Sequence, residues 1–127
     1  MSKPFSILLV EDNADDEQLT LRALRKLGAQ VDVVRDGQEA LDRLIDSDEA
    51  LPDIVLMDLN LPKVNGLELL RRLRENERTA GLVIVVLASS HEPDDVRAGY
   101  QKNADSFIEK PVTPENFAEV AGRLGVL

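Results

Sequence analysis

The 127-residue chain, with 43% hydrophobic and 31% charged residues, has the length and balance of one globular domain. Its net charge of −9 disfavours nucleic-acid binding, and the lack of cysteine excludes disulfides, thiol catalysis and thiolate metal sites. No apolar run approaches the roughly 18–20 residues that span a bilayer, and the chain does not begin like a signal peptide, so we expect a soluble cytoplasmic protein without a membrane or nucleic-acid partner.

The first half of the chain alternates between strand-like and helical patterns. Strands are predicted, in chain order, at residues 5–10, 31–34 and 54–57. Amphipathic stripes with helical spacing follow the first two strands, and they consist of Leu21, Leu24 and Leu27, and of Ala40, Leu41, Leu44 and Ile45. Gly28 is a natural C-terminal cap after the first stripe. The strand-like runs are almost continuously hydrophobic, which favours parallel strands that are buried on both faces.

The second half continues the alternation. A helical stripe of Leu69, Leu70 and Leu73 precedes a strand at 82–87. A weaker helical pattern at 93–102, with Tyr100 among its few large apolar residues, leads to a short strand at 106–108. Thr113 then caps a last helix. Five strands alternating with five helices predict an α/β fold, a (βα)₅ doubly wound five-stranded parallel sheet with helices on both faces.

Charged side chains follow three of the predicted strands, at the edge where an open parallel sheet binds its ligands. Glu11 and Asp12 follow the first strand, Asp58 follows the third, and Lys110 follows the fifth. Each alone has a simpler explanation, because acidic residues often compensate a helix dipole or cap a turn. Together, three carboxylates and one ammonium leave a formal charge of −2, which one divalent cation would neutralise. Oxygen ligands favour Mg²⁺, Ca²⁺ or Mn²⁺, and a lysine beside them suits a phosphoryl oxygen.

Three motifs, ILLVEDN, IVLMDLNLPKVNG and FIEKP, together resemble those of response-regulator receiver domains over the whole chain. The resemblance implies the flavodoxin-like fold of the chemotaxis-regulator type. Because the chain stops after the fifth predicted helix, we expect a single receiver domain over residues 1–127 with no output domain. The opening LLVEDNADDEQLTLRAL is similar to that of single-domain regulators that pair with phytochrome-type photoreceptor kinases.

The resemblance implies a signalling role in a two-component system rather than an enzyme activity. Asp58 would accept a phosphoryl group from a sensor histidine kinase, of phytochrome type if the similarity of the opening extends to the partner. Asp12, Asp58 and the backbone carbonyl of Asn60 would bind Mg²⁺, with Glu11 acting through water. The protein would then signal through protein contacts, including a homodimer made by the fourth helix, the fifth strand and the fifth helix.

The resemblance also assigns roles around the phosphoryl group. Lys110 would contact it, and the peptide bond between Lys110 and Pro111 is expected to be cis. Asn60 and Ser90 match in placement the residues that set the family's rate of dephosphorylation.

One position departs from the family's pattern. The fourth strand of the family ends in a threonine or serine whose hydroxyl binds the phosphoryl group, and the matching position here is Ala88. Such a charge-assisted hydrogen bond is worth about 1.5–3 kcal/mol, the size of a typical switching free energy. Either Ser89 replaces the hydroxyl, or phosphorylation moves this protein less than usual. Phe107 holds the place of the aromatic switch partner, and an ordinary strand aromatic would look the same.

Two other functions stay open at this point. A pseudo-receiver would act as a phosphorylation-independent binding module, and Ala88 is the single feature in its favour. An α/β phosphohydrolase that uses Asp58 would usually carry a second acid two positions on, where this chain has Asn60.

Overall fold

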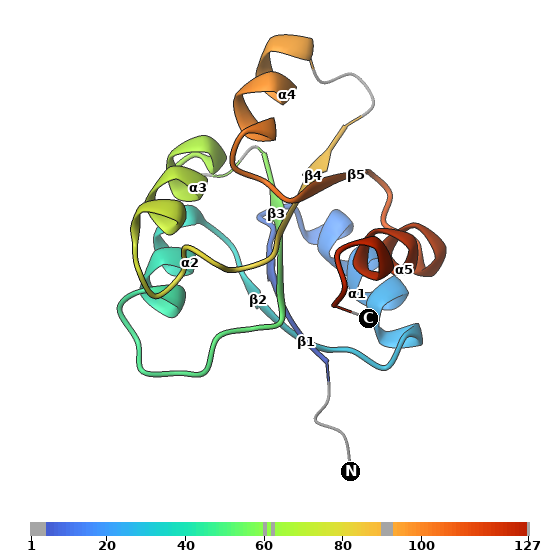
Figure 1. The fold of residues 1–127 in the computed structure, drawn as a ribbon. Coiled ribbons are helices and arrows are strands. Elements are labelled where there is room, and N and C mark those ends of the chain that lie inside the picture. The colour runs from blue at the N-terminus through green and yellow to red at the C-terminus, as the bar shows by residue number, and fades with distance from the viewer. Residues whose placement is uncertain (1–4, 60, 62, 90–92, 127) are drawn as a thin grey trace.

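A computed structural model describes residues 5–59, 61, 63–89 and 93–126, with a five-stranded sheet between two layers of helices (Figure 1). The five strands are β1 (Ser6–Val10), β2 (Gln30–Val34), β3 (Ile54–Asp58), β4 (Ile84–Ala88) and β5 (Ser106–Glu109). The five helices are α1 (Ala14–Lys26), α2 (Gly37–Leu44), α3 (Gly66–Glu75), α4 (Asp94–Gln101) and α5 (Pro114–Arg123). The predicted alternation of strands and helices is therefore confirmed, with ends that differ by one or two residues.

All strand pairs in the sheet are parallel, and the strand order is β2-β1-β3-β4-β5. The chain leaves β1 toward one edge to form β2, and then crosses to the other side of β1 to form β3. The carboxyl ends of β1 and β3 therefore lie side by side at the switch point of a doubly wound sheet, where ligands bind in such folds. The predicted topology is confirmed.

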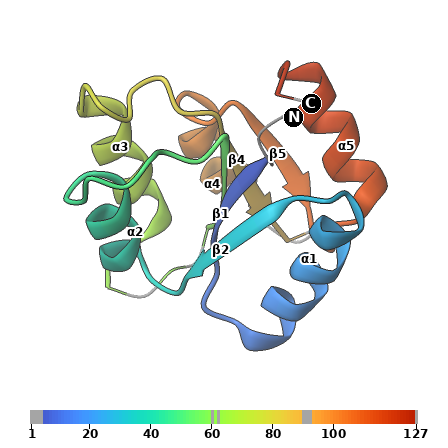
Figure 2. The same ribbon diagram turned by 90° about the horizontal axis from the view of Figure 1, so that it is seen from below.

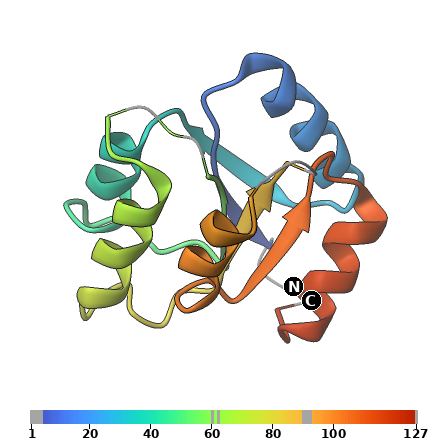
Figure 3. The same ribbon diagram turned by 90° about the horizontal axis from the view of Figure 1, so that it is seen from above.

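Each face of the sheet has its own hydrophobic core. Helices α1 and α5 cover one face, and α2, α3 and α4 cover the other (Figures 2 and 3). Phe117 of α5 is completely buried against the first face, and its ring lies 6.3 Å from that of Phe5 in an edge-on arrangement. None of the helices in the described ranges is both long and apolar enough to cross a membrane.

The expectation that the strands are buried on both faces is wrong for β2. This strand lies at the edge of the sheet, where Gln30 and Asp32 are exposed and its three valines are only partly buried. Asp32 instead forms an ion pair of 2.9 Å with Arg43 of α2. The four letters VDVV did not reveal this, because the burial of a strand depends on its place in the sheet.

The end of α1 also differs in one detail from the predicted stripe. Leu27 is the C-cap residue and is exposed, so the buried side of the helix ends at Leu24. Gly28 follows with a φ of 77°, the left-handed conformation that favours glycine after a helix.

Candidate functional site

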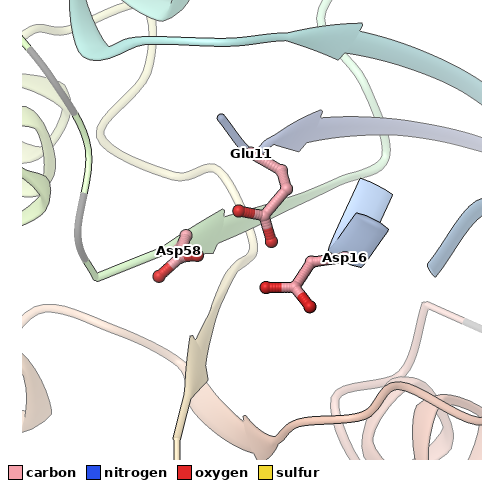
Figure 4. A group of neighbouring side chains, drawn as sticks. All are labelled: Glu11, Asp16 and Asp58. Carbon is pink, nitrogen blue, oxygen red and sulfur yellow. The ribbon is translucent and has the colours of Figure 1, made fainter. Parts of the chain in front are cut away.

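Three carboxylates from three segments meet at the switch point of the sheet (Figure 4). Glu11 follows β1 directly, Asp58 is the last residue of β3, and Asp16 lies in the first turn of α1. One oxygen of each lies within 4.8 Å of the others, and Glu11 and Asp58 are buried. Asn13 caps α1 by accepting a hydrogen bond from the Asp16 N–H, so the cap fixes the turn that carries this carboxylate.

Lys110 completes the cluster from the end of β5. Its Nζ donates hydrogen bonds to Asp58 Oδ2 at 2.5 Å, to Glu11 Oε1 at 3.0 Å and to Asp16 Oδ2 at 3.0 Å. Its backbone N–H donates to the Ala88 carbonyl at 2.9 Å, which ties the ends of β4 and β5 together. The peptide bond between Lys110 and Pro111 is cis.

The charges of the cluster shift the ionisation of its members. Burial, together with the neighbouring Asp58 carboxylate, raises the pKa of Glu11 to about 7, although Lys110 opposes the shift. Burial lowers the pKa of Lys110, but its hydrogen bonds to Asp58, Asp16 and Glu11 outweigh this and leave the pKa well above its ordinary value. Lys110 therefore stays charged at physiological pH, while Glu11 binds a proton readily unless a further cation joins the cluster.

The cluster opens into a polar pocket of about 500 Å³. The pocket is lined by Asp12, Asn13, Ala14, Asp16, Asp58, Ser89 and Lys110. Carboxylate oxygens crowd one side of this pocket and an ammonium lies beside them, so it offers oxygen ligands to a hard divalent cation and a hydrogen-bond donor to an anionic oxygen.

The segment after Asp58 is held against the start of α2. Asp36 caps that helix, and its Oδ2 lies 3.3 Å from Lys63 Nζ. The hydrogen bond from the Glu39 N–H, together with Lys63, lowers the pKa of Asp36. Next to this pair, a Cβ added to Gly37 would lie 2.2 Å from the Val64 carbonyl oxygen, so the two backbones approach as closely as glycine allows.

The structure brings together most, but not all, of the expected site residues. Glu11, Asp58 and Lys110 meet as the strand ends predict, whereas Asp12 is exposed and lines the pocket outside the tight cluster. Asp16 was not predicted. The run ADDE at the start of α1 holds three acidic residues, and which of them faces the lysine depends on the phase of the helix.

The residues expected to tune or switch the site have different surroundings. Asn60 and Ser90 lie outside the described residues. Ala88 is buried as the last residue of β4, and the exposed Ser89 lines the pocket. Phe107 is half-buried on β5, with the Arg97 guanidinium 5.8 Å from the centre of its ring.

Comparisons with known proteins identify the family of the chain. A model of the response regulator receiver domain family matches residues 7–121. The probable methanogenesis regulatory protein FilR2 of Methanothrix harundinacea is 41% identical over 118 residues, which cover 89% of this chain and 76% of that protein.

Solved structures of similar proteins include two informative cases. The bacteriophytochrome response regulator AtBRR superposes with a TM-score of 0.86 at 39% identity, covering 99% of this chain and 96% of its own. The receiver domain of a sensor histidine kinase from Pseudomonas aeruginosa, with a magnesium ion coordinated in its active-site cleft, has a TM-score of 0.83 at 27% identity, covering 95% of this chain and 97% of its own.

Proposed function

The chain belongs to the response regulator receiver domain family, and on that basis we propose that it accepts a phosphoryl group from a sensor histidine kinase onto Asp58. The observation that carries the proposal is the convergence of Lys110, Glu11 and Asp16 on Asp58 at the mouth of an open pocket. The modified protein would then signal through contacts with other proteins.

Asp58 has the properties of a nucleophile that a bulky donor can reach. Its carboxylate ends a fully buried strand, so the backbone beneath it is rigid, and its oxygens face the pocket. In the transfer, an Asp58 oxygen forms a bond to phosphorus while the bond from phosphorus to the donor's imidazole nitrogen breaks. The imidazole nitrogen takes a proton from solvent, and the product is an acyl phosphate on Asp58.

Lys110 would bind the incoming phosphoryl group. Its ammonium now contacts three carboxylates, and a phosphoryl oxygen offers the same kind of charge-assisted hydrogen bond. Ser89 would supply the hydroxyl that Ala88 lacks, because among the described residues it is the serine that lines the pocket beside Asp58 and Lys110.

The donor set of the pocket fits a magnesium ion. Its carboxylates come from Glu11, Asp16, Asp58 and, at the rim, Asp12, and this oxygen-only set suits a hard divalent cation. By family resemblance the backbone carbonyl of Asn60 would add a ligand. When bound, the ion would neutralise charge on the phosphoryl oxygens.

The partners follow from the same resemblance. A phytochrome-type kinase is the partner that the likeness to AtBRR supports, and the cytoplasm is where such a kinase would meet this protein. We also propose that the protein forms a homodimer through α4, β5 and α5. It would signal as a single receiver domain.

Intact mass spectrometry tests the proposal. The protein is incubated with Mg²⁺ and acetyl phosphate, and the expected result is a gain of one phosphoryl group that is lost with hydroxylamine. Asp58→Asn should abolish the gain, whereas Asp42→Asn, at an exposed position on α2, should leave it unchanged. No adduct at any Mg²⁺ concentration would refute the proposal and favour a pseudo-receiver, and sustained hydrolysis of excess acetyl phosphate would favour a phosphohydrolase.

A further inference from the structure

Helix α4 has one fully buried anchor, Tyr100, among the side chains that the structure describes. It spans only eight residues, Asp94–Gln101, and Pro93 at its N-cap makes no side-chain hydrogen bond to the helix. Among the α4 side chains that the structure describes, only that of Tyr100 is buried, with 5% of its surface exposed. Val96 packs against the core and Arg97 lies over the Phe107 ring, but Tyr100 reaches deepest into the domain, so its contacts contribute to the position of α4.

The Tyr100 hydroxyl contacts the backbone directly after the phosphoryl acceptor. It donates a buried hydrogen bond of 3.2 Å to the carbonyl of Leu59, the residue that follows Asp58. The contact thus joins residues 41 positions apart in the sequence. A shift of the backbone next to Asp58 moves the acceptor of this bond, and a shift of α4 moves its donor.

The first residue of α3 leaves room for this contact. A Cβ added to Gly66 would lie 2.7 Å from the Tyr100 hydroxyl and 2.8 Å from the Leu59 carbonyl oxygen. It would also lie 3.1 Å from the carbonyl oxygen of Asp58. The hydroxyl therefore sits in a recess that the absence of a side chain at Gly66 provides, and the recess reaches the carbonyl of Asp58 itself.

Two other positions near Asp58 carry no hydroxyl that could link the phosphoryl site to the surrounding helices. Ala88, the last residue of β4, has no hydroxyl. Phe107 on β5 has none either, and its ring contacts Arg97 of α4. Tyr100 supplies a hydroxyl from α4 at the end of β3.

We propose that Tyr100 is a positioning residue that couples α4 to Asp58 through the Leu59 carbonyl. The inference rests on the proposed function, because it requires a chemical event at Asp58. Phosphorylation would change the hydrogen bond and thereby shift α4. Since coupling between two sites is reciprocal, a protein that docks on α4 would change in turn how readily the phosphoryl group is held at Asp58.

The composition of the chain supplies a direct probe of this contact. Tyr100 is the only tyrosine and the chain has no tryptophan, so its intrinsic fluorescence comes from this one side chain. Adding Mg²⁺ and acetyl phosphate to the wild-type protein should change the tyrosine emission as the Asp58 adduct forms. The same additions to Asp58→Asn should produce no such change.

A pair of matched variants separates coupling from general stability. Tyr100→Phe removes only the hydroxyl. Thr79→Val removes another buried hydroxyl, which donates to the Leu73 carbonyl at 2.6 Å in the turn after α3 and is not in contact with the site. Each variant leaves one buried carbonyl without that partner, so both should lower stability to a similar extent.

The expected effects differ between the two variants. Tyr100→Phe should slow the phosphorylation of Asp58 by roughly two- to tenfold, the equivalent of one hydrogen bond, and should shrink the amide chemical-shift changes in α4 on phosphorylation. Thr79→Val should change neither quantity.

Each outcome decides one question. If the wild-type protein gains the adduct, and Tyr100→Phe matches it in rate and in the α4 shifts, the inference is wrong while the proposed function stands. If the wild-type protein gains no adduct, the proposed function fails and the inference fails with it. An unchanged tyrosine emission during wild-type phosphorylation also overturns the inference, so the test remains decisive if Tyr100→Phe does not fold.

Discussion

Substitution of Asp16 tests whether the carboxylate cluster binds a divalent cation. The Asp16 carboxylate belongs to the cluster with Glu11 and Asp58, and it also pairs with Lys110. Asp16→Asn keeps the size of the side chain and removes its charge. Because both the cluster and its lysine lose a negative partner, we expect the variant to bind Mg²⁺ more weakly.

The size of the effect follows from the distances in the cluster. Its oxygens lie within 4.8 Å of one another, so an ion held by them would lie no more than about 5 Å from Asp16. At that separation a divalent cation and a carboxylate attract by roughly 1.7 kcal/mol in bulk water, and by more at lower dielectric. Because the Asp16 side chain is 38% exposed and solvent screens the attraction, the value for water is the conservative one. We therefore expect a loss of about 1–2 kcal/mol, or about a five- to thirtyfold rise in the Kd for Mg²⁺.

Isothermal titration of Mg²⁺ at pH 8 and low salt measures this change. Asp15→Asn is the matched control, because Asp15 lies in the same turn of α1 and is exposed outside the cluster. It removes the same charge from the protein and should shift the Kd less than twofold.

Two results would refute the reasoning. If Asp16→Asn binds Mg²⁺ as tightly as the wild-type protein does, the carboxylate takes no part in the site. If Asp15→Asn weakens binding as much as Asp16→Asn does, the effect comes from the net charge of the helix and not from the cluster.

Three further predictions concern ionisation, packing and the phosphoryl site. In EDTA, the carboxyl carbon of Glu11 should titrate near pH 7 in NMR spectra. Because this folded-state pKa lies above the ordinary value of 4.5, the contribution of Glu11 to the free energy of unfolding should rise as the pH falls from 7 toward 4.5. In Glu11→Gln, the free energy of unfolding should not show this rise. Gly37→Ala should lower the free energy of unfolding by about 1–3 kcal/mol, because its Cβ would collide with the Val64 backbone. Gly122→Ala in open space on α5 should be neutral or stabilising, and urea titration of both variants measures the difference. Ser89→Ala should shorten the lifetime of the Asp58 adduct at least tenfold if the hydroxyl makes a charge-assisted hydrogen bond, and an unchanged lifetime by mass spectrometry would exclude that role.

The sequence was sufficient for the architecture because hydrophobic runs and stripes report directly on buried surfaces. The run IVLM at 54–57 predicts a strand that is buried on both faces, and its burial in β3 is complete. The run VDVV at 31–34 is equally long and differs by one charged residue, yet β2 lies at an edge. Burial on the second face depends on which strands are neighbours, and that is a property of the whole sheet.

The candidate site was predictable to the extent that backbone topology determines it. Glu11, Asp58 and Lys110 are adjacent to strand ends, and parallel strands bring those ends to one edge. Asp16 lies inside a helix, so its direction depends on the angle at which α1 leaves β1. The contact of Tyr100 with Leu59 was equally hidden, since it depends on the room that Gly66 leaves.

The polar edge of the sheet has a consequence for how the protein behaves at high concentration. An open edge strand can pair with the same strand of another molecule. Charged side chains on the edge strand commonly prevent such pairing. A second molecule adding to β2 would have to accommodate Asp32 and the ion pairs that Arg43 forms with Asp32 and Glu49. The departure of β2 from a fully apolar strand thus guards the fold against edge-to-edge aggregation at an edge that is two strands from β3.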